Sequence, residues 1–137
     1  MTTTLVIKNS TDGAAKLSSH MDWAGFKPAP RKIPVGSDQM FLHVADNRGS
    51  RGAVVYEVKD GYRWLLAWAN QPSVDNQVYT KILKIGEKIN WDNISSQLDQ
   101  GTFTSNHSTA GFTSTVTIDL TAGSPTLRAE LNYDRPS

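Results

Sequence analysis

Two consecutive runs of β-branched and aromatic residues, 54–58 and 62–68, dominate the hydrophobic pattern in the middle of the chain. They are joined by Asp60-Gly61, a pair favoured in tight hairpin turns because both positions tolerate positive φ. In the second run, strand alternation places Trp64 and Trp68 on one face, while the other face is apolar as well. A strand that is apolar on both faces is normally central and covered from both sides. The pattern therefore predicts a β-hairpin at the centre of the protein.

Shorter apolar or alternating runs on either side of this hairpin predict further strands. They cover residues 5–7, 15–26, 39–45, 78–85, 114–120 and 126–133. Alternation in the run 15–26 puts Leu17, Ser19 and Met21 on one side of its strand. Short strands separated by turn signals favour an antiparallel β-sandwich or barrel over alternating strands and helices. No repeat or composition shift divides the chain, so residues 1–137 are expected to form a single domain.

One short helix is predicted near residues 91–100. Its apolar residues fall at i, i+3 and i+7, and they are Trp91, Ile94 and Leu98. Asn90 can cap the first turn, and Gly101 can close the last turn in left-handed geometry. Trp91 is therefore expected to hold the helix against the sheets.

Charge and cysteine content narrow the function classes. Lys and Arg total 14 against 13 Asp and Glu, a net charge of +1, so the balance gives no support to nucleic acid as a partner. The chain has no cysteine, which excludes disulfides and thiolate metal sites. The first residues lack the basic and apolar regions of a signal peptide, so a cytoplasmic protein, or one released without a conventional signal, is expected.

Catalytic and cofactor motifs are missing from the sequence. It contains no phosphate-binding glycine loop, nucleophile elbow or paired metal-ligand helix, so neither a cofactor nor a metal is predicted. The acid-base candidates are His20, Asp22 and His43, and alternation places His20 and Asp22 on one strand face. A small enzyme using these three residues stays open as an alternative, although a hydrolase would also need a nucleophile within reach.

Amphipathic aromatic residues near polar loops provide the alternative to catalysis. Aromatic faces flanked by carboxylates or amides can hold a sugar ring or a choline cation. The candidate contact residues are Trp23, Trp68, Asn70, Asp75, Asn76 and Tyr79. For Trp68 a place in the core is favoured over ligand contact, whereas for Trp23 and Tyr79 both interpretations stay open.

The arrangement of residues also resembles two known groups of proteins. The first resemblance, to the plant jasmonate-induced proteins, covers most of residues 5–95. It rests on Trp23-x-Gly25, Pro30, Ile33-x-x-Gly36, Phe41-x-His43, Gly52-Ala53-Val54-Val55-Tyr56, Ala67-Trp68, Val78-Tyr79 and Ile89-x-Trp91. More distantly, the order of strands, Asp-Gly hairpin, polar loop and short helix is similar to the actinoporin-like β-sandwich of sea-anemone cytolysins and mushroom fruit-body lectins. This resemblance implies an antiparallel β-sandwich.

The departures from the cytolysins limit what the resemblance implies. Those proteins insert an N-terminal amphipathic helix, whereas four residues precede the first expected strand here. The loop equivalent to their tyrosine cluster contributes only Tyr79, so pore formation has little support. The expected function is a non-enzymatic recognition module in stress or defence that binds a glycan or a membrane-lipid headgroup. Peripheral membrane contact is compatible with this function, and a homo-oligomer or a subunit of a larger assembly is a further alternative.

Overall fold

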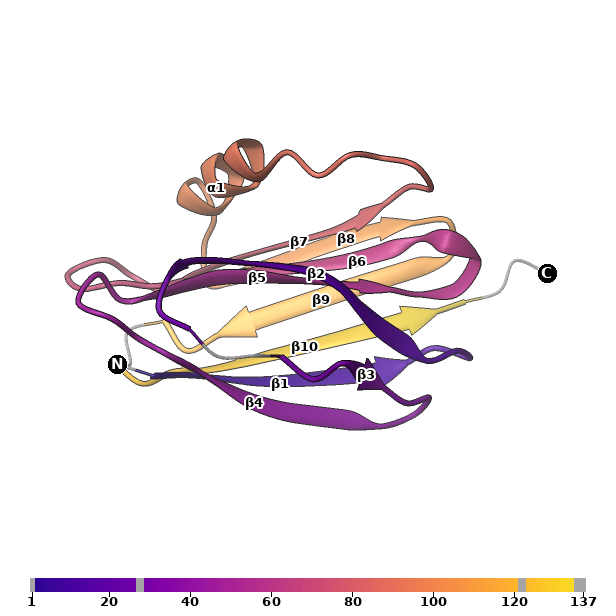
Figure 1. The fold of residues 1–137 in the computed structure, drawn as a ribbon, viewed down its shortest axis with the longest axis horizontal. Helices are drawn as coiled ribbons and strands as arrows, with labels where there is room; N and C mark the ends of the chain where they lie inside the picture. Colours follow the sequence, from indigo (N-terminus) through magenta and orange to yellow (C-terminus); the bar gives the residue numbers. More distant parts are fainter. Residues whose placement is uncertain (1, 27–28, 121–122, 135–137) are drawn as a thin grey trace.

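Two five-stranded β-sheets pack face to face, and a short helix lies outside one of them (Figure 1). The computed structural model describes residues 2–26, 29–120 and 123–134. The strands are β1 (Thr2–Ser10), β2 (Ala15–Ala24), β3 (Lys32–Ile33), β4 (Asp38–Val44), β5 (Ser50–Glu57), β6 (Arg63–Asn70), β7 (Gln77–Leu83), β8 (Thr104–Thr109), β9 (Phe112–Ile118) and β10 (Thr126–Tyr133), and the α-helix is α1 (Trp91–Asp99). The predicted two-sheet β-sandwich with one short helix is confirmed.

The strand order brings the two ends of the described chain together in one sheet. Sheet A has the order β4-β1-β10-β9-β8, and sheet B has the order β3-β2-β5-β6-β7. In sheet A, β1 pairs with β10 in parallel, whereas every other ladder among the described residues is antiparallel. The parallel pair arises because β1 and β10 are not joined by a hairpin, so no tight turn fixes their relative direction.

The predicted central hairpin is formed by β5 and β6. Asp60 and Gly61 both adopt positive φ, 61° and 80°, as the Asp-Gly pair predicts. Trp64 and Trp68 point into the core between the sheets, while Leu65 and Ala67 point to the outer face of sheet B. The helix α1 covers that outer face, which explains why both faces of β6 are apolar.

The helix α1 confirms the predicted position and N-cap. The Asn90 side chain accepts a hydrogen bond from the Asn93 backbone N–H, and Ile94 and Leu98 are buried against sheet B. The prediction of a left-handed Gly101 is wrong, because the φ angle of Gly101 is not positive. A glycine is required there for space, since a Cβ would lie 2.8 Å from the Val78 carbonyl oxygen.

The predicted face of β2 is partly wrong because the strand contains irregularities. Its register against β5 shifts between Leu17 and Ser19 and again between Asp22 and Ala24. A β-bulge of this kind turns the following side chains to the other face of the sheet. Leu17 therefore packs against the core between the sheets, whereas Met21 packs on the outer side near α1.

Side chains, not a backbone ladder, join the two sheets between β7 and β8. Ser105 Oγ accepts from the Thr80 N–H at 3.1 Å, and His107 Nδ1 accepts from the Ile82 N–H at 2.9 Å. These contacts satisfy donors on the free edge of sheet B, where they would otherwise be open to pairing with another strand. Among the residues that the structure describes, no helix has the length and apolar character needed to cross a bilayer.

Candidate functional site

A groove lies at the end of the sandwich where the β6–β7 loop meets the segment that follows α1. Its volume is about 720 Å³. The lining residues are Ser73, Val74, Asp75, Asn76, Gln77, Gly101, Thr102, Phe103 and Leu120. Three separate segments of the chain therefore build this groove, which is within the range of about 300–1,000 Å³ that is typical of ligand sites.

Hydrogen bonds hold the β6–β7 loop in place on both sides of the groove. Asn76 Nδ2 donates to the Asp119 carbonyl oxygen at 2.7 Å, and the Asn76 N–H donates to the Leu120 carbonyl oxygen at 2.9 Å. On the other side, Gln77 Nε2 donates to the carbonyl oxygens of Asp99 at 2.9 Å and Gly101 at 3.2 Å. The groove is thus shaped before any ligand arrives, which lowers the entropic cost of binding.

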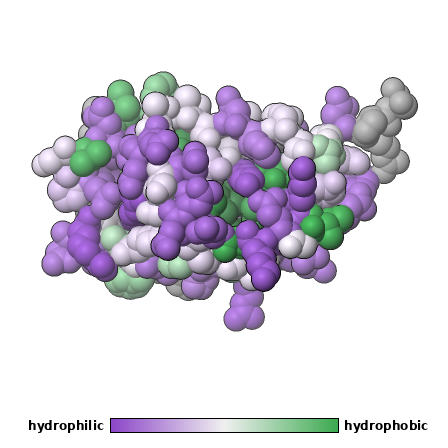
Figure 2. Space-filling view, turned by 90° about the horizontal axis from the view of Figure 1, so that it is seen from above, coloured by the Kyte–Doolittle hydropathy of each residue, from purple (hydrophilic) through white to green (hydrophobic). Residues whose placement is uncertain are grey.

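Apolar side chains exposed to solvent line this groove. The exposed fractions are 57% for Val74, 45% for Phe103 and 43% for Leu120. The carboxylate of Asp75 is exposed on the same loop. Seen from the helix side, hydrophobic residues form a few separate patches on a mostly hydrophilic surface, and one patch lies at the end that carries the β6–β7 loop (Figure 2). Exposed apolar residues grouped beside polar ones are typical of interaction sites.

The structure brings only two of the predicted contact residues into this groove. Asp75 and Asn76 line it, although Asn76 is itself buried and supports the loop. Tyr79 and Trp23 lie elsewhere, half-buried on the outer face of sheet B against the cluster that α1 covers. The predicted contact residues therefore do not converge on one pocket.

Trp23 takes part in the attachment of α1 to sheet B. Its ring packs edge-on against Trp91 with 6.1 Å between centroids, and the guanidinium carbon of Arg51 lies 5.4 Å from its centroid. Arg51 is buried, donates to Ser95 Oγ at 2.7 Å and pairs with Asp99 at 3.0 Å. The Trp23 side chain thus has a structural role in these contacts.

Trp68 and Asn70 belong to a buried polar network at the end of the core. Trp68 is 1% exposed, and its Nε1 donates to Ser50 Oγ at 3.3 Å. Asn70 is also buried; its Nδ2 donates to the Gly123 carbonyl oxygen at 3.2 Å and to Thr3 Oγ1 at 3.4 Å. Neither side chain presents a surface to a ligand in this conformation.

The same network contains a serine, a histidine and an aspartate in a row. Ser50 Oγ lies 2.6 Å from His43 Nδ1, and His43 Nε2 lies 2.8 Å from Asp22 Oδ1. Ser50 Oγ already accepts hydrogen bonds from Thr3 and Trp68. The Ser50 hydroxyl is therefore assigned as the donor to His43 Nδ1, and His43 Nε2–H as the donor to Asp22. Ser50 is completely buried, so its hydroxyl cannot reach a substrate in this structure. The row therefore stabilises the fold and lacks an accessible nucleophile.

His20, the other residue of the enzyme alternative, stands outside this row. Its Nδ1 lies 4.0 Å from Asp22 Oδ2, and its side chain is largely exposed. His20 and Asp22 do share a strand face as predicted, but Asp22 uses its other carboxylate oxygen to hold His43. The arrangement fits a carboxylate that positions a buried ring better than a general acid-base pair.

A model of the Nakanori-like protein family matches residues 1–131. The chain belongs to this family. Among curated relatives, the Nakanori-like chain is 29% identical over 128 residues to a "Jasmonate-induced protein homolog" of Atriplex canescens, a match that covers 83% of this chain and 69% of the relative. The predicted resemblance to jasmonate-induced proteins is thereby confirmed.

Two solved structures share the fold of this Nakanori-like chain. The lipid-binding protein Nakanori superimposes with a TM-score of 0.78 at 20% identity, over 98% of this chain and 71% of Nakanori. The lectin XCL of Xerocomus chrysenteron superimposes with a TM-score of 0.66 at 10% identity, over 96% of this chain and 100% of the lectin. The fruit-body lectin sandwich predicted from the order of elements is thus confirmed as a fold.

The apolar residues of the Nakanori-like groove were not predicted from the sequence. Phe103 stands alone within a polar Ser/Thr/Asn stretch, and Val74 is a single apolar residue in the polar β6–β7 loop. Leu120 continues the alternation of β9 and so resembles a core residue. An isolated apolar residue in a polar loop is the signal that could have identified Phe103 and Val74.

Proposed function

We propose that this protein is a non-enzymatic recognition module that binds a membrane-lipid headgroup in the groove at the β6–β7 end of the sandwich. The observation that carries the proposal is the group of exposed apolar side chains, Val74, Phe103 and Leu120, around a groove that also holds the Asp75 carboxylate. The fold shared with the lipid-binding protein Nakanori supports the same conclusion.

The chemistry of the groove matches a lipid headgroup at the surface of a bilayer. Val74, Phe103 and Leu120 can enter the boundary between headgroups and acyl chains, where burying an apolar side chain contributes about 1.5–3 kcal/mol. The Phe103 ring and the Asp75 carboxylate are both groups that attract a quaternary ammonium. A zwitterionic choline headgroup therefore fits the groove better than a purely anionic one.

Vesicle flotation at fixed protein concentration tests this proposal. The wild-type protein is expected to float with phosphatidylcholine vesicles. Phe103→Ser is expected to weaken the binding about tenfold, because the variant loses about 1.4 kcal/mol or more of the binding free energy that comes from burying the ring in the bilayer. Ile85→Ser is a matched control: Ile85 is 67% exposed but lies beside Gly61, at the other end of β6. Equal losses in both variants, or no flotation of the wild type, would contradict the proposal.

A parallel glycan array separates the lipid from the second ligand class. The lectin XCL has the same fold, so a glycan is the ligand that competes with the lipid headgroup for this groove. If the wild type binds glycans on the array but no vesicles, and Phe103→Ser abolishes the glycan binding, then the ligand of the groove is a glycan and not a lipid. Asp75→Asn provides a second arm: it should weaken binding to choline vesicles and spare any binding to phosphatidylglycerol vesicles.

A further inference from the structure

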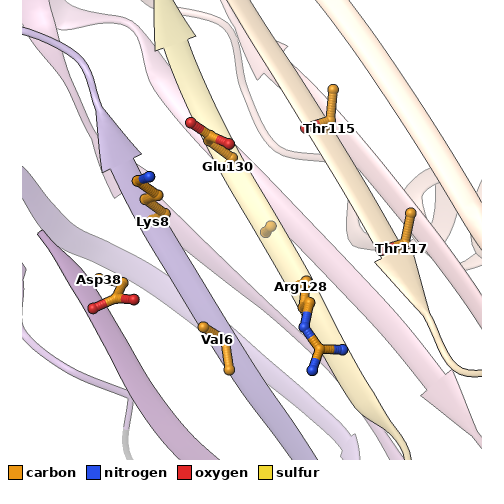
Figure 3. A pocket seen from close by; sticks show the side chains of 8 residues that line it. Val6, Lys8, Asp38, Thr115, Thr117, Arg128 and Glu130 are labelled. Atoms are coloured by element: carbon orange, nitrogen blue, oxygen red, sulfur yellow. The ribbon is translucent and has the colours of Figure 1, made fainter. Parts of the chain in front are cut away.

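The outer face of sheet A carries a second hollow, and none of the residues that line it also lines the groove. Its volume is about 280 Å³, and its lining includes Val6, Lys8, Asp38, Thr117, Arg128 and Glu130. The hollow forms because the short side chains of Val6, Thr115 and Thr117 lie among longer charged ones. Lys8 and Glu130 stand at one end of it, and Val6 and Arg128 at the other (Figure 3).

Strand register fixes the charges around this hollow. Lys8 on β1 lies opposite Asp38 on β4 and Glu130 on β10, so a basic residue has an acidic neighbour on each side. Arg128 lies opposite Val6 on one side and Thr117 on the other. The row through Lys8 therefore alternates carboxylate and ammonium groups across three strands, whereas Arg128 stands between an apolar side chain and a hydroxyl.

These charged side chains make no direct ion pairs with one another. Within the described part of the chain, Lys8, Asp38 and Arg128 form no ion pair, even though register places Lys8 next to two carboxylates. Glu130 has a fixed orientation, because Ser10 Oγ donates to its Oε2 at 2.6 Å. The hollow thus offers cationic donors and carboxylate acceptors whose hydrogen-bonding capacity is still available to a ligand.

We infer that this hollow is a second binding site, independent of the lipid groove, and that it takes a single sugar ring. A hydroxyl group is both donor and acceptor, so a ring with neighbouring hydroxyls can satisfy Lys8 or Arg128 and a carboxylate at the same time. Val6 offers an apolar surface for the C–H face of such a ring. The volume lies just under the roughly 300 Å³ at which drug-sized sites begin, which suits one ring and not a long chain.

Amide chemical-shift mapping on the ¹⁵N-labelled protein tests the site with galactose and N-acetylglucosamine as probes. At least one of them is expected to shift amides of β1, β9 and β10 around Val6 and Arg128. Arg128→Ala and Glu130→Gln should each weaken the binding about tenfold, the size expected when a hydrogen bond to a charged group is lost. Lys88→Ala, an exposed charge outside the hollow, is the control and should leave the binding unchanged.

Two outcomes would overturn this inference. One is the absence of shifts with both sugars, or shifts confined to the β6–β7 loop. The other is that inorganic phosphate alone shifts the same amides, which would make the hollow an anion site around Lys8 and Arg128. Flotation with phosphatidylcholine vesicles distinguishes this site from the proposed lipid groove. Arg128→Ala should float like the wild type. If the sugars shift these amides in a protein that does not bind vesicles, only the proposal of lipid binding in the groove is rejected.

Discussion

The two sheets of this sandwich use their outer faces in opposite ways. Sheet B is apolar on both sides, and α1 covers its outer face through Ile94 and Leu98. The inner side of sheet A is apolar, whereas its outer face is open to solvent and mixed, with charged residues such as Lys8 and Arg128 beside the exposed Met40 of β4. Sheet B is therefore a closed scaffold, whereas sheet A and the end of the sandwich offer surfaces to ligands. Two substitutions at outer-face positions can break this comparison.

The largest expected effect is that of Leu65→Ala on the outer face of sheet B. Leu65 is completely buried beneath the helix side, so its truncation leaves a cavity and should lower the free energy of unfolding by about 2–5 kcal/mol. Val6→Ala is the matched change on the outer face of sheet A and should cost about 1 kcal/mol or less, because Val6 is only partly buried there. Urea denaturation of both variants measures the difference, and equal losses would contradict the division between the sheets.

A smaller effect is expected from Arg51→Ala, which removes the attachment of α1. Arg51 is buried and donates to Ser95 Oγ and to the Ser95 carbonyl oxygen, while it pairs with Asp99. Loss of these charged hydrogen bonds should cost about 1.5–3 kcal/mol. Hydrogen exchange should show that α1 opens before the sheets do.

A conservative replacement at the same position sharpens this test. Arg51→Lys keeps the charge but cannot reproduce the planar fork that reaches two partners and stacks on Trp23. It should recover only part of the loss. Full recovery by lysine would show that charge alone holds the helix.

The smallest expected effect is a pH dependence at the β7–β8 edge. Burial lowers the pKa of His107, nearby Lys81 lowers it further, and Glu87 opposes them. Its Nδ1 accepts from the Ile82 N–H, so the neutral ring is the one that fits the fold. Because the folded pKa lies below the ordinary value of about 6.5, the unfolded chain binds more protons in that range. Stability from this contact is full above about pH 6.5 and is lost as the pH falls through the folded pKa.

The matching variant for this pH dependence is His107→Asn. An asparagine carbonyl can accept a hydrogen bond but does not titrate between pH 5 and 7. As the pH is lowered from 7 to 5, the urea midpoint of the wild type should fall, and that of the variant should fall less. Parallel curves for the two proteins would assign the pH dependence to other groups.

The parts of the fold that local pattern controls could be predicted from the sequence. The Asp60-Gly61 turn and the two apolar faces of β6 identified the central hairpin, and the spacing of Ile94 and Leu98 identified α1. The face of Met21 could not be predicted, because a bulge in β2 depends on how β5 pairs with it. Local periodicity carries no information about such a shift.

The candidate site was harder to predict because it depends on contacts between distant segments. Asp75 and Asn76 follow from the polar loop after β6. Asn70 lies in a similar polar context but is buried through Thr3, which is 67 residues away. Phe103 enters the groove only because the chain returns from α1 to the same end of the sandwich. Residues that meet through tertiary structure leave no mark in a single sequence.

The most direct test of the lipid groove uses a fluorescent label at its rim. The chain has no cysteine, so Val74→Cys and Ile85→Cys each create one site for an environment-sensitive dye. With phosphatidylcholine vesicles, the dye at position 74 should shift to shorter wavelength as it enters the bilayer boundary, and the dye at position 85 should not. A shift at position 85 alone, or at neither position, would contradict recognition of lipid at the β6–β7 end.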